Sequence, residues 1–260
     1  MHNVTSSNQP IFVIGCPGSG TTLLFSMLES HPNLSCGNET DFLPELSTIL
    51  EGRYWNKLQD YGFDKAYWYK KLADFFDSFK MDYAQKHGKR RWVDKTPSYT
   101  SHLDLIHTLF PNCQIVHIIR DGRDVVMSAR NRWGYKTAVK FTYKWREYVS
   151  SAREVGKTLS PEQYMEVRYE SLVAQPEVVG KEIFNFLQEP WYDDVLKFHK
   201  SSSYKPERKY EKYVDQQRKR EQSESFVYRS RVGTGQNLEP ILKGLLYLYA
   251  GGLLKELGYQ

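Results

Sequence analysis

Two apolar runs in this chain share one arrangement, because each ends in a polar loop that precedes a helical pattern. Residues 10–15 form a short apolar run, and a turn rich in Gly, Ser and Thr separates it from a helical pattern over 22–30. Residues 113–120 form a second run with many β-branched residues, and another helical pattern starts at Asp124. Short apolar runs bounded by turn residues predict buried strands. Each segment therefore predicts a strand, a loop and a helix.

The remaining pattern extends this alternation of strands and helices. Residues 164–169 predict a third strand, and residues 179–187 predict a helix after it. Two aromatic and charged stretches with helical spacing, 54–88 and 141–155, are predicted to form helices that cover the sheet or line a cleft. Strands that alternate with helices favour an α/β fold with a mainly parallel central sheet flanked by helices.

Length and composition predict one domain over residues 1–260. The chain has 260 residues, of which 40% are hydrophobic and 15% aromatic, enough for one sizeable core. We expect residues 1–9 to be flexible and the charged segment 205–224 to be a solvated helix or a mobile segment. The apolar stretch at 241–254 is interrupted by Gly and Lys, so no membrane span is expected. No signal peptide pattern follows Met1, which favours a cytoplasmic location.

A formal net charge of +5 suits an anionic ligand, but so mild an excess does not separate nucleotides from nucleic acids or membrane surfaces. The basic residues in 205–220 could bind nucleic acid, yet nothing else in the sequence requires it, and we expect no such partner. Three scattered cysteines, Cys16, Cys36 and Cys113, are too few for a disulfide framework or a tetrahedral metal site. We therefore expect no metal.

The loop over residues 15–22 reads Gly-Cys-Pro-Gly-Ser-Gly-Thr-Thr and has the features of a phosphate site. Between a strand and a helix, successive backbone N–H groups and the positive end of the helix dipole can hold an anion. Gly18 and Gly20 permit backbone conformations that other residues rarely adopt. The position at which a nucleoside triphosphatase loop carries Lys is Thr21 here, which argues against ATP or GTP hydrolysis.

A second anion site is predicted where the strand over 113–120 leads into a helix. Ser128 and Arg132 are four residues apart and share one helical face, close to the strand end that carries Arg120. Two guanidinium groups and a hydroxyl would make a good phosphate clamp. In the alternative interpretation, Arg120 pairs with Asp121 or Asp124 at the start of the helix.

These two motifs in this order resemble those of the sulfotransferases, which transfer a sulfuryl group from 3′-phosphoadenosine 5′-phosphosulfate (PAPS). The resemblance implies a P-loop-like three-layer fold in which the first loop binds the 5′-phosphosulfate and the second motif binds the 3′-phosphate. It also extends to residues 167–176, similar to a Tyr-Glu-x-Leu segment, and to 229–235, similar to a late loop over the nucleotide. Tyr169 could equally be a core tyrosine. The residues implied in PAPS binding are Pro17, Gly18, Ser19, Gly20, Thr21, Thr22, Arg120, Ser128, Arg132, Tyr169, Ser230 and Arg231.

The same resemblance implies two reacting groups. Glu39 follows a His-Pro turn in a passage that most resembles tyrosylprotein sulfotransferases, where the matching glutamate is the general base; Asn38 and Asp41 depart from their pattern. A solvated loop carboxylate or a helix cap is the alternative for Glu39, and His31 is a second candidate base. Lys95, in Asp-Lys-Thr-Pro, resembles the lysine that stabilises the transferred group.

The implied function is sulfuryl transfer to an acceptor hydroxyl on a protein tyrosine, a carbohydrate or a small molecule. The family usually has Lys or Arg where this chain has Gly18, which leaves open a binding module for PAPS or its product that does not turn over. A P-loop nucleotide kinase is the other alternative.

Overall fold

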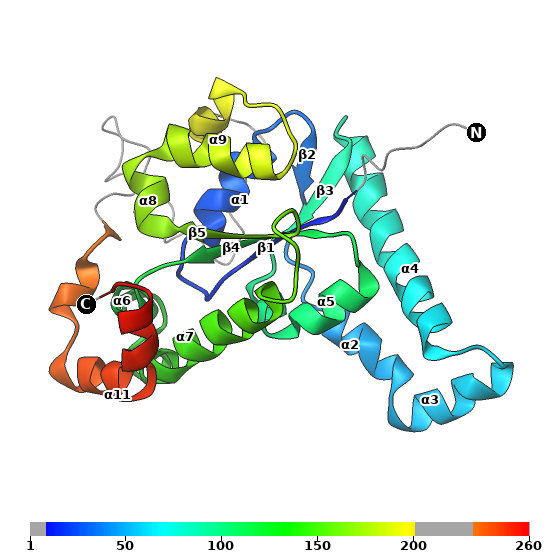
Figure 1. Cartoon of the computed structure of the whole chain (residues 1–260), viewed down its shortest axis with the longest axis horizontal. Coiled ribbons are helices and arrows are strands. Elements are labelled where there is room, and N and C mark those ends of the chain that lie inside the picture. Colours follow the sequence, from blue (N-terminus) through cyan, green and yellow to red (C-terminus); the bar gives the residue numbers. More distant parts are fainter. Residues whose placement is uncertain (1–8, 201–230, 260) are drawn as a thin grey trace.

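The computed structural model describes residues 9–200 and 231–259. Its centre is a five-stranded sheet in the order β2-β3-β1-β4-β5, and every pair of neighbouring strands is parallel (Figure 1). This confirms the predicted α/β fold with a parallel central sheet. The segment 205–224, Ser230 and residues 1–8 lie outside the described residues.

The elements follow the predicted alternation of strands and helices. The strands are β1 (Ile11–Ile14), β2 (Leu34–Cys36), β3 (Arg91–Asp94), β4 (Gln114–Ile119) and β5 (Tyr164–Arg168). The α-helices are α1 (Thr21–Glu29), α2 (Leu43–Ser47), α3 (Gly52–Leu58), α4 (Lys65–Lys86), α5 (Leu103–Leu109), α6 (Gly122–Trp133), α7 (Tyr135–Gly156), α8 (Tyr169–Ala174), α9 (Pro176–Phe186) and α11 (Pro240–Glu256). Shorter helical turns include η3 (Pro97–His102) and η7 (Thr234–Asn237).

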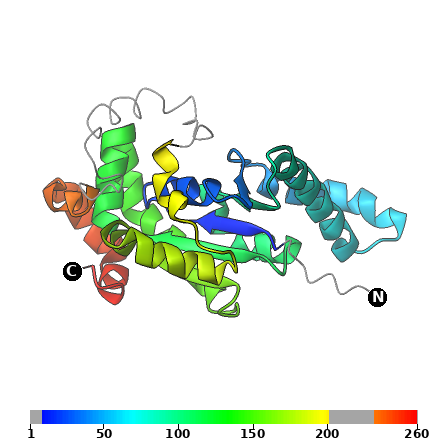
Figure 2. The same ribbon diagram turned by 90° about the horizontal axis from the view of Figure 1, so that it is seen from above.

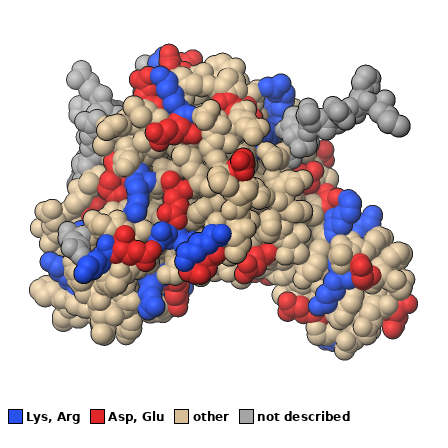
Figure 3. Space-filling model, in the orientation of Figure 1, with Lys and Arg blue, Asp and Glu red and all other residues tan. Residues whose placement is uncertain are grey.

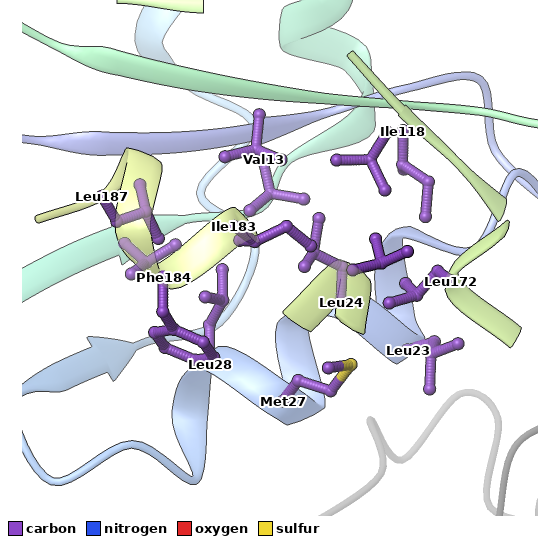
Figure 4. Packing of buried hydrophobic residues seen from close by; sticks show 14 of the residues in the cluster. Val13, Leu23, Leu24, Met27, Leu28, Ile118, Leu172, Ile183, Phe184 and Leu187 are labelled. Carbon is purple, nitrogen blue, oxygen red and sulfur yellow. The ribbon is translucent and has the colours of Figure 1, made fainter. Parts of the chain in front are cut away.

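Helices cover both faces of the sheet, because successive side chains of a strand point to opposite sides. Ile11 and Val13 of β1 lie in the cluster built by α1, α8 and α9, where Leu24 and Ile183 pack together (Figure 4). Phe12 and its alternate neighbours pack instead against α4, α5 and α7. A third cluster joins α6, α7 and α11 beyond the end of β4. These layers place β1 at the centre of the molecule.

The stretch 54–88, predicted to be helical, forms most of α3 and all of α4, which extend to one side of the sheet. Figure 2 shows this extension opposite the end of the molecule that carries α11. α4 covers the sheet through Ala73 and Phe76, whereas α3 buries no side chain. In residues 9–200 and 231–259, no helix combines the length and apolar character that a membrane crossing requires.

A buried ion pair joins α4 to the end of β3. Lys80 Nζ lies 2.6 Å from Asp94 Oδ2, and the two side chains are 3% and 0% exposed. The Lys80 ammonium also lies 5.7 Å from the centre of the Phe76 ring and 5.8 Å from that of Trp92. Removing one partner of such a pair leaves the other charge buried without compensation.

We therefore expect Lys80→Ala to lower the free energy of unfolding by about 3 to 5 kcal/mol, measured by urea denaturation. The matched control is Lys70→Ala on the same helix, because Lys70 forms an exposed ion pair with Asp74. That change should cost only about 0.5 kcal/mol or less. Equal losses for the two variants would contradict this account of the buried pair.

Candidate functional site

The predicted site residues follow the carboxyl ends of the strands. The glycine-rich loop follows β1, Glu39 follows β2, Lys95 follows β3, Arg120 follows β4 and Tyr169 follows β5. In a parallel sheet these ends share one edge, and ligands bind in the crevice outside that edge. The fold therefore gathers groups as far apart in the sequence as Gly18 and Tyr169, which are separated by 151 positions.

The glycine-rich loop has the geometry of an anion cradle. Gly18 and Gly20 have φ angles of +97° and +104°, in the region that favours glycine. Gly20 is the N-cap of α1, and the first turn of that helix has no acidic residue. Ser19 Oγ is buried and has no hydrogen-bond partner among the described residues. The backbone N–H groups and this hydroxyl can donate hydrogen bonds to a phosphate, and the positive end of the helix dipole attracts its charge.

Tyr169 packs directly against this loop. A Cβ atom on Gly20 would lie 2.4 Å from Cδ2 of Tyr169, so only glycine allows the ring to approach the backbone so closely. The Tyr169 side chain is 2% exposed, and burial raises the pKa of its hydroxyl. The two interpretations of this residue are therefore compatible, since a core tyrosine also forms one wall of the loop.

Arg120 connects the loop to several neighbouring elements. Its guanidinium donates to the carbonyl oxygens of Gly18, at 3.0 Å, and of Arg231. Nη2 also lies 3.3 Å from Asp124 Oδ2, and Cζ lies 4.6 Å from the centre of the Tyr169 ring. The alternative ion pair with Asp124 is thus present, but the same guanidinium also holds the loop after β1 beside the segment around Arg231.

Ser128 of α6 lies beside Gly18 of the glycine-rich loop. A Cβ atom on Gly18 would be 3.3 Å from Ser128 Oγ, and the φ of +97° would strain any residue with a side chain. Arg132 lies one helical turn further along α6 and is half-buried. The structure thus brings Gly18, Arg120 and Ser128 together, with Arg132 on the same face of α6 as Ser128.

Asp124 holds the late loop against the start of α6. Its carboxylate accepts hydrogen bonds from the N–H of Gly233 at 3.0 Å, the hydroxyl of Thr234 at 3.1 Å and the N–H of Gly235 at 2.6 Å. A Cβ atom on Gly235 would lie 2.4 Å from Cβ of Arg123, so this glycine is also needed for the close approach. Ser230 and Arg231 are the two residues predicted in the late loop. Arg231 lies at this contact, whereas Ser230 lies outside the described residues.

The predicted base and the predicted cation form an ion pair with each other. The Lys95 ammonium donates to Glu39 Oε1, and the Lys95 residue is 7% exposed. The same ammonium lies 5.4 Å from the centre of the Phe25 ring in α1, the helix that the glycine-rich loop begins. A carboxylate and an ammonium are therefore held together beside the candidate phosphate cradle.

His31, the second candidate base, has a structural role. Its Nδ1 accepts the N–H of Asn33 at 3.2 Å, and its Nε2 lies 2.9 Å from the carbonyl oxygen of Pro190, to which it donates. The ring is buried, and burial lowers its pKa. With both nitrogens engaged, His31 has no ring nitrogen that could accept a proton from a substrate.

Several polar residues at this edge were not predicted from the sequence. Thr100 accepts the N–H of Gly15 at 2.9 Å, although the two residues are 85 positions apart. Thr40, Asp94 and Tyr99 form a hydrogen-bonded group beside the Glu39 and Lys95 pair. No local spacing in the sequence predicts such contacts. The only sequence signal is that Asp94 and Tyr99 flank the Lys-Thr-Pro segment that carries Lys95.

The described residues contain no cluster of three or more His, Cys, Asp and Glu side chains that could hold a metal ion. Cys16, Cys36 and Cys113 are buried free thiols. Burial raises the pKa of all three, so each remains protonated at neutral pH.

Comparison with known proteins identifies the family. The sequence model of the sulfotransferase family matches residues 10–194. A protein-tyrosine sulfotransferase of Drosophila melanogaster is 31% identical over 201 residues, covering 72% of this chain and 39% of the relative. Protein-tyrosine sulfotransferase A of Caenorhabditis elegans is 31% identical over 199 residues, covering 72% of this chain and 51% of the relative. The chain thus spans about half or less of these relatives.

Solved structures show the same fold at lower identity. The sulfotransferase domain of an olefin synthase from Synechococcus PCC 7002 superposes with a TM-score of 0.65 at 21% identity, covering 96% of this chain and 98% of the other. A mouse sulfotransferase complexed with PAP superposes with a TM-score of 0.50 at 17% identity, covering 95% and 88%.

We expect Asp124→Ala to release the late loop from α6. Loss of a hydrogen bond to a charged group costs about 1.5 to 3 kcal/mol, so amide exchange at Gly233 and Gly235 should accelerate by about ten- to a hundredfold. Hydrogen exchange followed by NMR measures this. The control is Asp121→Ala, because Asp121 caps the same helix and its carboxylate forms no hydrogen bond with the described part of the loop, residues 231–235. Unchanged exchange at both glycines in Asp124→Ala would refute the assigned role.

Proposed function

Because the chain belongs to the sulfotransferase family, we propose that it transfers the sulfuryl group of PAPS to an acceptor hydroxyl. The observation that carries this proposal is the ion pair between Lys95 and Glu39 beside the glycine-rich loop. Sulfuryl transfer needs a base for the acceptor, a cation for the leaving oxygen and a site for the nucleotide phosphates. The sheet edge supplies a candidate for each.

In this proposal the glycine-rich loop binds the 5′-phosphosulfate, with N–H groups at the start of α1 as the main donors. Ser128 and Arg132 bind the 3′-phosphate from the neighbouring helix, and Arg120 keeps the two phosphate sites together through Gly18. Tyr169 packs beside the nucleotide. Support comes from the free hydroxyl in the loop and from the mouse sulfotransferase of the same fold, which is complexed with PAP.

In the proposed step, Glu39 takes the proton of the acceptor hydroxyl while the acceptor oxygen forms a bond to sulfur. The bond between sulfur and the bridging oxygen of the 5′-phosphate breaks, and adenosine 3′,5′-bisphosphate (PAP) leaves. Lys95 stabilises the charge that develops on that oxygen. No step needs a metal ion.

The acceptor class that we favour is a tyrosine hydroxyl, because the relatives at 31% identity are named protein-tyrosine sulfotransferases. Carbohydrates and small molecules carry the same reactive group and are the alternatives. Basic and acidic side chains are interspersed over the face of the molecule in Figure 3, which gives no support to a nucleic acid partner. The three free thiols fit the cytoplasmic location that we propose.

Calorimetric titration with PAP, ATP and GTP tests the nucleotide site. We expect PAP to bind at least about tenfold more tightly than either triphosphate, because a good charged contact to the 3′-phosphate contributes about 1.4 kcal/mol or more. Tighter binding of a triphosphate would favour the nucleotide kinase instead, and undetectable binding of all three would exclude both.

Lys95→Ala tests the catalytic assignment. Turnover of PAPS with a tyrosine-containing peptide should fall by about a hundredfold or more, because a preorganised charge at the leaving oxygen is lost. The Kd for PAP, measured by calorimetry, should change by less than about threefold. A variant with near-wild-type turnover would rule out this role. Wild-type protein that binds PAP yet transfers nothing to peptide, sugar or phenol acceptors would favour the inactive binding module.

A further inference from the structure

A polar network of two buried residues, Asp94 and Tyr99, and the half-buried Thr40 adjoins the Glu39 and Lys95 pair. Thr40 Oγ1 lies 3.2 Å from Asp94 Oδ2 and 2.6 Å from the hydroxyl of Tyr99. Asp94 is in turn paired with the buried Lys80 of α4. Thr40 directly follows Glu39 and Asp94 directly precedes Lys95, so the network joins the immediate neighbours of the two paired residues.

The hydrogen bonds of this network can be assigned a consistent direction. The Tyr99 oxygen accepts the N–H of Leu43 at 3.1 Å, so its own proton is available for Thr40. Thr40 then donates its proton to the Asp94 carboxylate. Burial raises the pKa of Tyr99, which keeps the phenol protonated as this direction requires. One hydroxyl, that of Thr40, therefore connects the aromatic ring to the buried carboxylate.

The backbone of Thr40 is held on the other side of Lys95. Its N–H donates to Thr96 Oγ1 at 3.1 Å. Thr40 thus contacts both chain neighbours of Lys95, Asp94 through its hydroxyl and Thr96 through its amide. Because successive residues at a strand end point to opposite sides, this clamp fixes the side from which the Lys95 ammonium meets Glu39.

Stability alone is a weak explanation for such a network. Replacing a buried ion pair by well-packed apolar residues is often neutral or stabilising, so the pair of Lys80 and Asp94 is costly to maintain. A polar network does, however, impose one arrangement on the groups that it joins. The groups joined here are the loop after β2 and the end of β3, which carry the candidate base and the candidate cation.

We infer that Thr40 is a positioning residue, which aligns Glu39 with Lys95 through its contacts with Asp94, Tyr99 and Thr96. The alignment itself is a property of the protein without substrates, whereas its catalytic consequence rests on the proposed sulfuryl transfer. Thr40→Val keeps the shape of the side chain but removes the hydroxyl, and Thr40→Ser keeps the hydroxyl. Tyr99→Phe removes the next hydroxyl in the network while the buried ring stays in place.

The first experiment measures the coupling of Glu39 with Lys95 without any substrate. Urea unfolding of Glu39→Gln, Lys95→Met and the double variant gives their interaction free energy, and the cycle is repeated in Thr40→Val, Thr40→Ser and Thr108→Val. Thr108 is a control because its exposed hydroxyl donates to the carbonyl oxygen of Asp104 within α5 and has no other hydrogen bond to the described residues. The coupling should fall to about half or less in Thr40→Val and persist in the other two backgrounds. An unchanged coupling in Thr40→Val would overturn the inference.

The second experiment measures turnover of PAPS with a tyrosine-containing peptide. Thr40→Val should lower kcat by about tenfold or more, because a small misplacement of reacting groups is costly, while KM for PAPS and the Kd for PAP stay within about twofold. Thr40→Ser should recover most of the loss, and Tyr99→Phe should lower kcat in the same direction. A uniform loss of PAP binding and kcat, not recovered by Ser, would show a merely structural role and contradict the inference.

The two experiments separate this inference from the proposed function. Wild-type protein that fails to bind PAP overturns the proposed function, whereas the coupling cycle still accepts or rejects the role of Thr40 in alignment. If Thr40→Val does not fold, the same cycle in Tyr99→Phe decides the matter: a coupling as large as in the wild-type protein then rejects the network.

Discussion

The parallel arrangement of the five strands is the constraint on which the candidate site depends. Each strand ends at the same edge, so the segments that follow them, from the glycine-rich loop to the start of α8, become neighbours regardless of their distance in the sequence. β1 lies between β3 and β4, and its residue Phe12 is paired with Asp94 of β3 and with Ile115 of β4. The loop after β1 is therefore flanked by the two loops that carry Lys95 and Arg120.

Buried charge is concentrated at this edge, and it is consistently paired. Arg120 is paired with Asp124, Lys95 with Glu39, and Asp94 with Lys80. Burying these charged groups costs desolvation energy that an apolar core would not incur. Such destabilising features are common at sites where function restricts the choice of residue. A function at this edge of the sheet therefore explains the charged pairs better than a contribution to stability does.

The sequence predicted the parts of the fold that depend on local pattern. The runs that became β1, β4 and β5 were long enough to be recognised with the helices after them, and that of β4 is also rich in β-branched residues. β2, with three residues, and β3, with four residues and a charge at each end, were missed, because such short runs carry no clear period. The candidate residues were found by their motifs, but their contacts were not. Lys95 meets Glu39 across 56 positions, a pairing that only the order of strands creates.

The neutral residue at position 18 is consistent with this distribution of charge. The backbone of Gly18 has a positive φ and lies close to Ser128, so the loop makes a close approach to α6 that a basic side chain would hinder. Its carbonyl oxygen, moreover, is already held by Arg120. Under the proposed function, the cation that acts on the leaving group is Lys95 at the end of the neighbouring strand β3, and its ammonium lies over the Phe25 ring of the helix that this loop begins. The positive charge for the leaving group is therefore placed at the end of β3 and not in the glycine-rich loop. Glu39 and the network around Thr40 determine the position of the Lys95 ammonium there.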